Sequence, residues 1–86
     1  MKIYKTVILS YGETLSEDLF VEENKAIKYL KEWLLHIGEL RGIGLEEKDI
    51  IPVEDPYHIT FVNDRTKKTF PEVYIEKLET LDDLTL

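Results

Sequence analysis

The residues best suited to chemistry in this sequence lie between positions 46 and 58, where five carboxylates precede a histidine. A histidine beside a carboxylate can take up and release a proton near neutral pH. His58 with Glu54 or Asp55 is therefore a candidate acid–base pair in a small-molecule-binding or catalytic site. A packing role within a strand, or a plain surface position, fits His58 equally well.

The same carboxylates form a candidate docking patch for the basic surface of another protein. They are Glu46, Glu47, Asp49, Glu54 and Asp55. The segment 42–62 holds these five acids against Lys48 alone, which gives it a formal charge of −4. The simpler interpretation is that solvated loops carry charge for solubility. The sequence leaves both interpretations open.

Other candidate sites have simpler explanations. His36 and Glu39 are three residues apart, a spacing that can serve one metal ion, but His36 falls on the polar side of a predicted helix. Gly42 and Gly44 follow that helix, whereas phosphate-binding loops precede one, so they indicate helix termination. The acidic segment lacks the pattern of a calcium loop, and no serine stands in a nucleophile-elbow sequence. We therefore expect a protein that is not an enzyme and holds no metal or cofactor.

Composition limits the classes of partner. The chain has 86 residues, enough for a single domain over 1–86, and 43% of them are hydrophobic. It has no cysteine, which excludes disulfides and makes a cytoplasmic location the default expectation. The net charge of −7 disfavours direct binding to nucleic acids or anionic membranes. No stretch is apolar for long enough to span a membrane.

These observations favour a small acidic protein-binding module. In its most specific form, it is an inhibitor from a phage or mobile element that occupies the basic, nucleic-acid-binding surface of a host enzyme. That form is an analogy of size and charge, since the sequence contains no recognisable family motif. The alternatives are the His58 site and a homo-oligomeric structural protein, such as a homodimer that pairs sheet faces or edges.

The strongest periodicity lies in residues 22–41 and predicts one amphipathic helix. Its apolar arc consists of Ala26, Ile27, Leu30, Trp33, Leu34, Ile37 and Leu40. If the helix begins late, Asn24 is the expected N-cap residue; if it begins early, Ser16 or Asp18 is. Gly42 can adopt the left-handed conformation that ends helices.

Alternating residues predict strands over 2–11, 57–62 and 69–78, of which the last two form a hairpin. The polar stretch 13–18 predicts a turn, and 19–21 is either a short strand or a lead into the helix. The connection 45–55, with 50–53 as a possible strand, contains Pro52 and so lies at a sheet edge or in a crossover. The tail 79–86 is either a frayed helical turn or a segment whose leucines pack on the body.

Together these elements predict an α+β domain in β-α-β-β order. One long helix packs on one face of a mainly antiparallel sheet of three or four strands. The opposite face is then free for a partner or a second copy. The apolar side chains expected there are Ile8, Val62, Val73 and Ile75.

Overall fold

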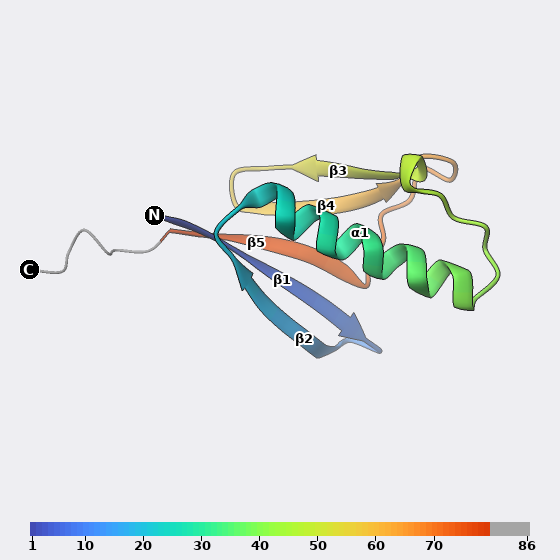
Figure 1. The fold of residues 1–86 in the computed structure, drawn as a ribbon, viewed down its shortest axis with the longest axis horizontal. Coiled ribbons are helices and arrows are strands. Elements are labelled where there is room, and N and C mark those ends of the chain that lie inside the picture. Colours follow the sequence, from blue (N-terminus) through green and yellow to red (C-terminus); the bar gives the residue numbers. More distant parts are fainter. Residues whose placement is uncertain (80–86) are drawn as a thin grey trace, which may run out of the picture.

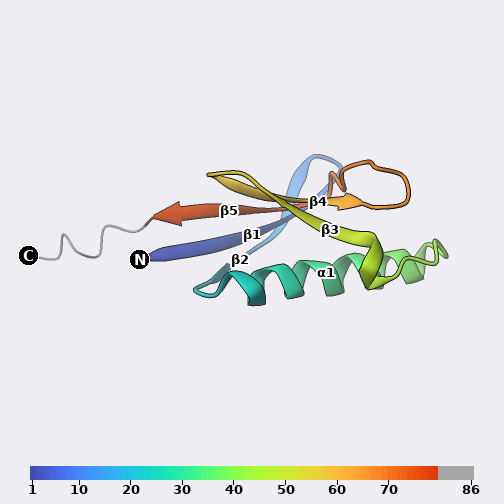
Figure 2. The same ribbon diagram turned by 90° about the horizontal axis from the view of Figure 1, so that it is seen from above.

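The computed structural model describes residues 1–79, which form an antiparallel five-stranded sheet with one helix on a single face (Figures 1 and 2). In chain order the elements are β1 (Lys2–Ser10), β2 (Glu13–Phe20), α1 (Glu23–Leu40), the 3-10 helix η1 (Glu47–Asp49), β3 (Ile50–Glu54), β4 (His58–Asn63) and β5 (Val73–Glu79). The predicted α+β architecture is confirmed. The predicted strand number and β-α-β-β order are wrong, because five strands are present and two of them precede the helix.

The additional strand is β2, which occupies the stretch predicted to be a turn. It pairs antiparallel with β1, with a register irregularity after Ile8. The turn between them is short and has positive φ at both central residues, Tyr11 (52°) and Gly12 (81°), as in the type I′ turns of hairpins. The acidic and serine-containing sequence of β2 has a low strand propensity, but pairing with β1 outweighs it.

The sheet order is β2-β1-β5-β4-β3, which places β1 in the interior and β2 and β3 at opposite edges (Figure 1). Helix α1 connects these two edges across one face of the sheet. The possible strand at 50–53 is confirmed as β3, and its edge position explains how Pro52 is accommodated. Residues 19–21 do not form a strand of their own, because Leu19 and Phe20 end β2.

The predicted hairpin of the last two strands is confirmed as β4 and β5, but β5 begins at Val73 rather than at 69. The connection before it contains Pro71 and a single bridge between Val62 and Thr69. A proline cannot donate to a ladder, so regular pairing resumes only beyond it. Glu79, the first residue of the predicted tail 79–86, is the last residue of β5. The predicted helical turn or packed leucines would fall in 80–86, which lie outside the described residues.

Helix α1 buries one stripe, formed by Ala26, Leu30, Leu34 and Gly38. The core beneath it is completed by sheet residues, namely Ile8, Ile50, Ile59, Phe61, Val73 and Ile75. The prediction that Ile8, Val73 and Ile75 lie on the uncovered face is therefore wrong. Val62 alternates with the buried Phe61 and so lies on the uncovered face as predicted. β1 carries apolar residues on both faces, with Val7 3% and Ile8 2% exposed, so alternation alone did not reveal which face meets the helix.

The two ends of α1 differ in how well the sequence indicated them. Glu22 is the N-cap residue, without a side-chain capping bond, so the predicted caps at Asn24, Ser16 and Asp18 are wrong. At the other end the N–H of Gly42 donates to the carbonyl of Glu39 (3.1 Å), and Ile43 N–H donates to Gly38 (2.9 Å). With Gly42 at φ 67° these bonds form a Schellman motif, which confirms the predicted helix stop.

Neither helix within residues 1–79 combines the length and the apolar character that crossing a membrane would require.

The burial of α1 gives a direct test of the packing. Leu30 is fully buried, whereas Leu40, which belongs to the same predicted arc, is 70% exposed. We expect Leu30→Ala to lower the free energy of unfolding by about 2–5 kcal/mol, because it leaves a cavity under the helix. Leu40→Ala should change it by less than about 0.5 kcal/mol. Urea denaturation followed by Trp33 fluorescence measures both, and equal losses would contradict this packing.

Candidate functional site

The predicted acidic patch contains one carboxylate that is part of the fold. Asp49 is 4% exposed, and its carboxylate accepts hydrogen bonds from the backbone N–H of Glu46 (3.0 Å) and from Arg65 (2.7 Å). The Arg65 guanidinium, and next the backbone bond, lower the pKa of Asp49. The same pair raises the pKa of Arg65. Asp49 therefore ties η1 to the connection between β4 and β5, and it is unavailable to a partner.

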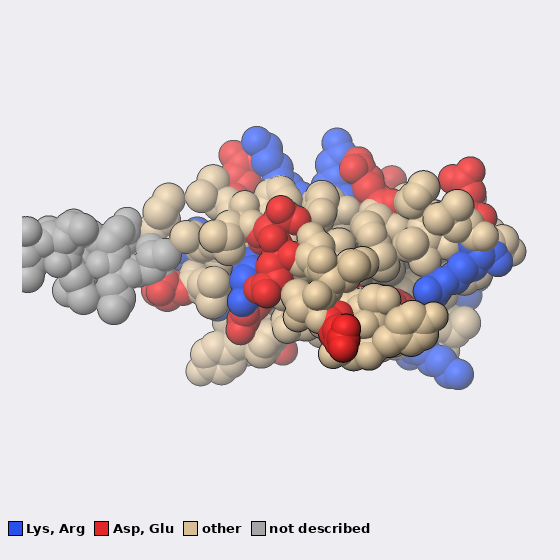
Figure 3. All heavy atoms as spheres, turned by 90° about the horizontal axis from the view of Figure 1, so that it is seen from below, with Lys and Arg blue, Asp and Glu red and all other residues tan. Residues whose placement is uncertain are grey.

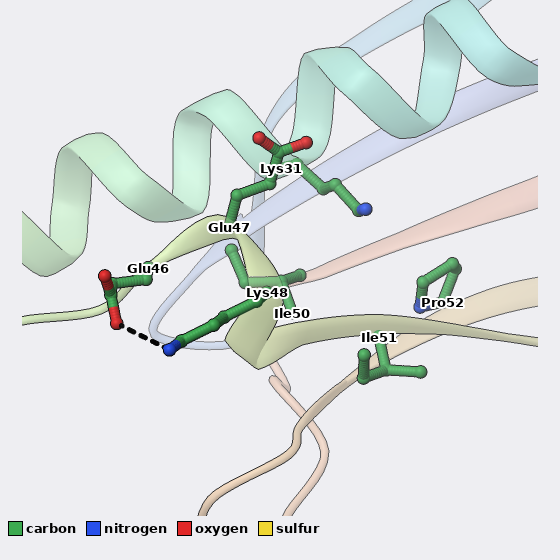
Figure 4. A pocket seen from close by; sticks show the side chains of 7 residues that line it. All are labelled: Lys31, Glu46, Glu47, Lys48, Ile50, Ile51 and Pro52. Atoms are coloured by element: carbon green, nitrogen blue, oxygen red, sulfur yellow. Dashed lines mark ion pairs between the residues drawn. The ribbon is translucent and has the colours of Figure 1, made fainter.

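Beside Asp49, a shallow hollow of about 540 Å³ opens between α1 and β3 (Figure 4). Glu46 lies 3.5 Å from both Lys48 and Arg65. Glu47 is exposed, and Figure 4 shows it facing the hollow together with Lys31 of α1. The lining thus has both signs of charge, and this part of the patch is not a uniformly negative surface.

The other two predicted carboxylates lie at the far end of β3. Glu54 pairs with Lys77 of β5 at 3.0 Å. Glu23, in the first turn of α1, faces Glu54 across a hollow of about 180 Å³. Interaction with the neighbouring Glu54 carboxyl, and next its partial burial, raise the pKa of Glu23, whereas Glu23 and Lys77 lower the pKa of Glu54.

Asp55 shapes the turn that leads into β4. Its carboxylate accepts the backbone N–H groups of Tyr57 (2.8 Å) and His58 (2.7 Å), which lowers the pKa of Asp55. His58 Nδ1 lies 3.9 Å from the Asp55 carboxylate, so the two groups proposed as an acid–base pair do approach each other. The His58 side chain is 46% exposed, and its ring lies in a T-shaped arrangement with that of Tyr74, with 6.1 Å between the ring centres. A turn and a cross-strand contact account for both residues.

Four of the five predicted patch residues are therefore engaged by a cation or a backbone N–H, and the patch is divided between the two ends of β3. Its role in binding stays a prediction. Within residues 1–79, no three histidine or carboxylate side chains are placed to hold a metal ion. His36 is exposed on α1, as predicted.

The face of the sheet opposite α1 is only partly apolar. Val7 is almost completely buried there, and Lys5 beside it pairs with both Glu76 and Glu17 at 3.0 Å. These carboxylates, Glu76 foremost, raise the pKa of Lys5. Ile51 and Val53 near the β3 edge are 40% and 48% exposed. An internal ion-pair network thus occupies part of the surface that the sequence suggested for a partner.

The surface that sequence reasoning missed is the β2 edge. All but two residues of this eight-residue strand are exposed, and Leu15 and Leu19 are 63% and 65% exposed. Figure 3 views the molecule from the side on which β2 is outermost: tan and red atoms fill the middle, and most blue atoms lie near the outline. The signal that was available is Gly12, which suits the second central position of a tight hairpin turn, whereas Tyr11 is not a residue type that such turns favour.

The direction of the backbone along β2 follows from two contacts. The Thr6 hydroxyl donates to the carbonyl of Asp18 (3.3 Å), so Asp18 faces β1. On the other side of β1, the N–H of Leu9 donates to the carbonyl of Glu72, so the backbone groups of Leu9 point away from β2. Thr6 lies three residues earlier on β1, so its backbone groups point toward β2. In antiparallel sheets the N–H and C=O of successive residues point to alternate sides. The backbone groups of Glu17 and Leu19 therefore point outward from the sheet.

A groove of about 390 Å³ continues from this edge to the C-terminal half of α1. Leu15 of β2 lines it together with Trp33 and Ile37 of the helix. An ion pair between Arg41 and Glu72 (3.8 Å) lies at the same groove. The β2 edge thus adjoins a depression that can hold a side chain, with apolar walls at Leu15, Trp33 and Ile37 and the charged groups of Arg41 and Glu72.

Comparison with models of known protein families, with curated proteins and with solved structures finds no match to this chain.

The Asp49 contacts predict a specific loss of stability. Asp49→Ala removes both the acceptor for Glu46 N–H and the partner of Arg65, and we expect the Tm at pH 7 to fall by about 4–8 °C. Glu47→Ala is the matched control and should leave the Tm unchanged. Because folding lowers the pKa of Asp49, its contribution is present above its ordinary pKa of 3.8 and is lost as pH falls through the folded value. A Tm difference that persists at pH 2 would contradict this assignment.

The Glu23 side chain predicts the opposite dependence on pH. Folding raises the pKa of Glu23, so its contribution to stability is present below its ordinary pKa and is lost as pH rises through the folded pKa, while the lowered pKa of Glu54 acts in the other direction. Glu23→Gln removes the negative charge beside Glu54, and we expect it to raise the Tm at pH 7 by about 1–3 °C. The gain should shrink as the pH falls and the Glu23 carboxylate of the wild type becomes protonated. Calorimetric scans between pH 4 and 8 measure this, and a gain independent of pH would contradict the raised pKa of Glu23.

Proposed function

We propose that this chain is a non-enzymatic protein-binding module that takes an extended segment of a partner protein onto the edge strand β2. The observation that carries this proposal is the difference between the two edges of the sheet. β3 is five residues long and contains Pro52, two features that protect an edge against further pairing. β2 is eight residues long, contains no proline and exposes two leucines.

The outward backbone groups of Glu17 and Leu19 supply the hydrogen bonds that such an addition needs. An extended segment placed beside β2 would continue the antiparallel sheet, and its main chain would supply most of the affinity. Side chains on alternate positions would then set specificity. This mode of binding requires no catalytic group, in keeping with the structural roles of Asp49 and Asp55.

The acidic character of the chain favours a partner with a basic surface. In the most specific form of the proposal, that surface belongs to a nucleic-acid enzyme, and the chain competes with the phosphate backbone for it. The exposed Glu17 and Asp18 of β2 support an acidic contact at this edge. Glu47, which is exposed in the acidic connection 45–55, is a second contact point, and the binding experiment on β2 also tests it.

Proline substitution at an outward position tests the proposal. Leu19→Pro removes an outward N–H without removing a bond to β1, which edge strands tolerate. Leu19→Ala is the matched control, because it removes the side chain and keeps the N–H. With the chain immobilised in a bacterial lysate, we expect a specific partner to be retained by Leu19→Ala and reduced at least about tenfold by Leu19→Pro.

Circular dichroism must first show that both variants keep the fold of the wild type. A partner that binds Leu19→Pro as well as the wild type would contradict strand addition. If Glu47→Lys abolished the binding of such a partner, the acidic connection would be the contact surface instead. A strictly salt-independent interaction would argue against the basic partner.

A further inference from the structure

We infer that the segment received by β2 is basic, with lysine or arginine side chains alternating with apolar ones, and that it belongs to another protein rather than to a second copy of this chain. This inference rests on the proposed function, since it names the partner of the same edge. It is motivated by the charges on β2, by the sharing of Lys5 and by the groove at Leu15.

The stretch 11–21 contains Glu13, Glu17 and Asp18 and has no lysine or arginine. Lys5 of the neighbouring strand β1 forms an ion pair with Glu17, which shares this lysine with Glu76. The Glu17 side chain remains 47% exposed in spite of this pair. The edge is therefore a negative strip whose charge the protein compensates only in part, and a basic segment would complete the compensation.

A second copy is a poor occupant of this edge. Antiparallel pairing of two β2 strands would place the same three carboxylates of each copy on adjacent strands. Like charges on neighbouring strands destabilise pairing. Pairing of β2 with β3 of another copy would meet Pro52 within a strand of only five residues. Both self-associated arrangements are thus disfavoured by charge or by lost hydrogen bonds.

The groove adjoining the edge accounts for the apolar part of the segment. Leu15 belongs both to β2 and to the groove, where Trp33 and Ile37 of α1 form the opposite wall. A strand placed along β2 would bring one of its side chains to this depression. We therefore expect a large apolar residue at the end of the segment that lies nearest to the hairpin turn of Tyr11 and Gly12.

A library of random dodecapeptides provides a probe that requires no knowledge of the natural partner. The library is selected on the full chain after depletion on Leu19→Pro. We expect the surviving peptides to be rich in lysine or arginine at alternate positions, with β-branched or aromatic residues between them and few prolines. The double variant Glu13→Gln and Glu17→Gln, which keeps the backbone groups, should bind a selected peptide at least about fivefold more weakly.

The outcomes separate the two proposals. Peptides that depend on Leu19 N–H but are neutral or acidic would overturn the basic segment and leave strand addition intact. If depletion on Leu19→Pro removed every peptide that binds the full chain, or if no peptide bound at all, both would be overturned. Sedimentation velocity of the wild type supplies an independent check: a monomer up to 100 μM is expected, and a dimer that Leu19→Pro dissociates would assign the edge to a second copy. If Leu19→Pro does not fold, a chain with an N-methylated Leu19 backbone, which lacks the same N–H, replaces it in the depletion step.

Discussion

The structure depends on β1 being paired along both of its sides and buried on both of its faces. Thr6, Val7 and Ile8 are each no more than 3% exposed, although they point in alternating directions. A strand in this position must satisfy its backbone groups on each side, and β2 and β5 do so. The existence of β2 as a strand is thus a consequence of the position of β1, and not of its own sequence.

The position of β1 also decides how the rest of the chain is distributed. Because β5 takes the other side of β1, the hairpin of β3 and β4 extends the sheet away from β2, and α1 must cross from one edge to the other. The stripe around Leu30 then covers the central strands on one face, and the two edges lie open to solvent. The edges differ in their protection, and that difference, rather than any catalytic cluster, is the feature that supports a binding function.

Charge in this protein has two separate uses. Asp49, Glu54 and Asp55 hold η1, β3 and the turn into β4 in place through Arg65, Lys77 and backbone N–H groups. These acids contribute to stability, and their negative charge is largely compensated. On β2, Glu17 shares Lys5 with Glu76, and Asp18 accepts hydrogen bonds from the neutral hydroxyl groups of Ser16 and Tyr29. These contacts leave negative charge at the edge for an external partner to compensate. The net charge of −7 therefore does not by itself locate the surface that recognises a basic molecule.

The sequence by itself determined the helix, its glycine stop at Gly42 and the hairpin of the last strands, and it limited Pro52 to a sheet edge or a crossover. Each of these follows from local periodicity or from a residue with special backbone properties. Tertiary structure alone decided that residues 13–18 form a strand, which face of β1 meets α1, and which carboxylates remain available. These outcomes depend on contacts between segments far apart in the chain: the pairing with β1, the apolar residues on both of its faces, and the approach of Arg65 to Asp49.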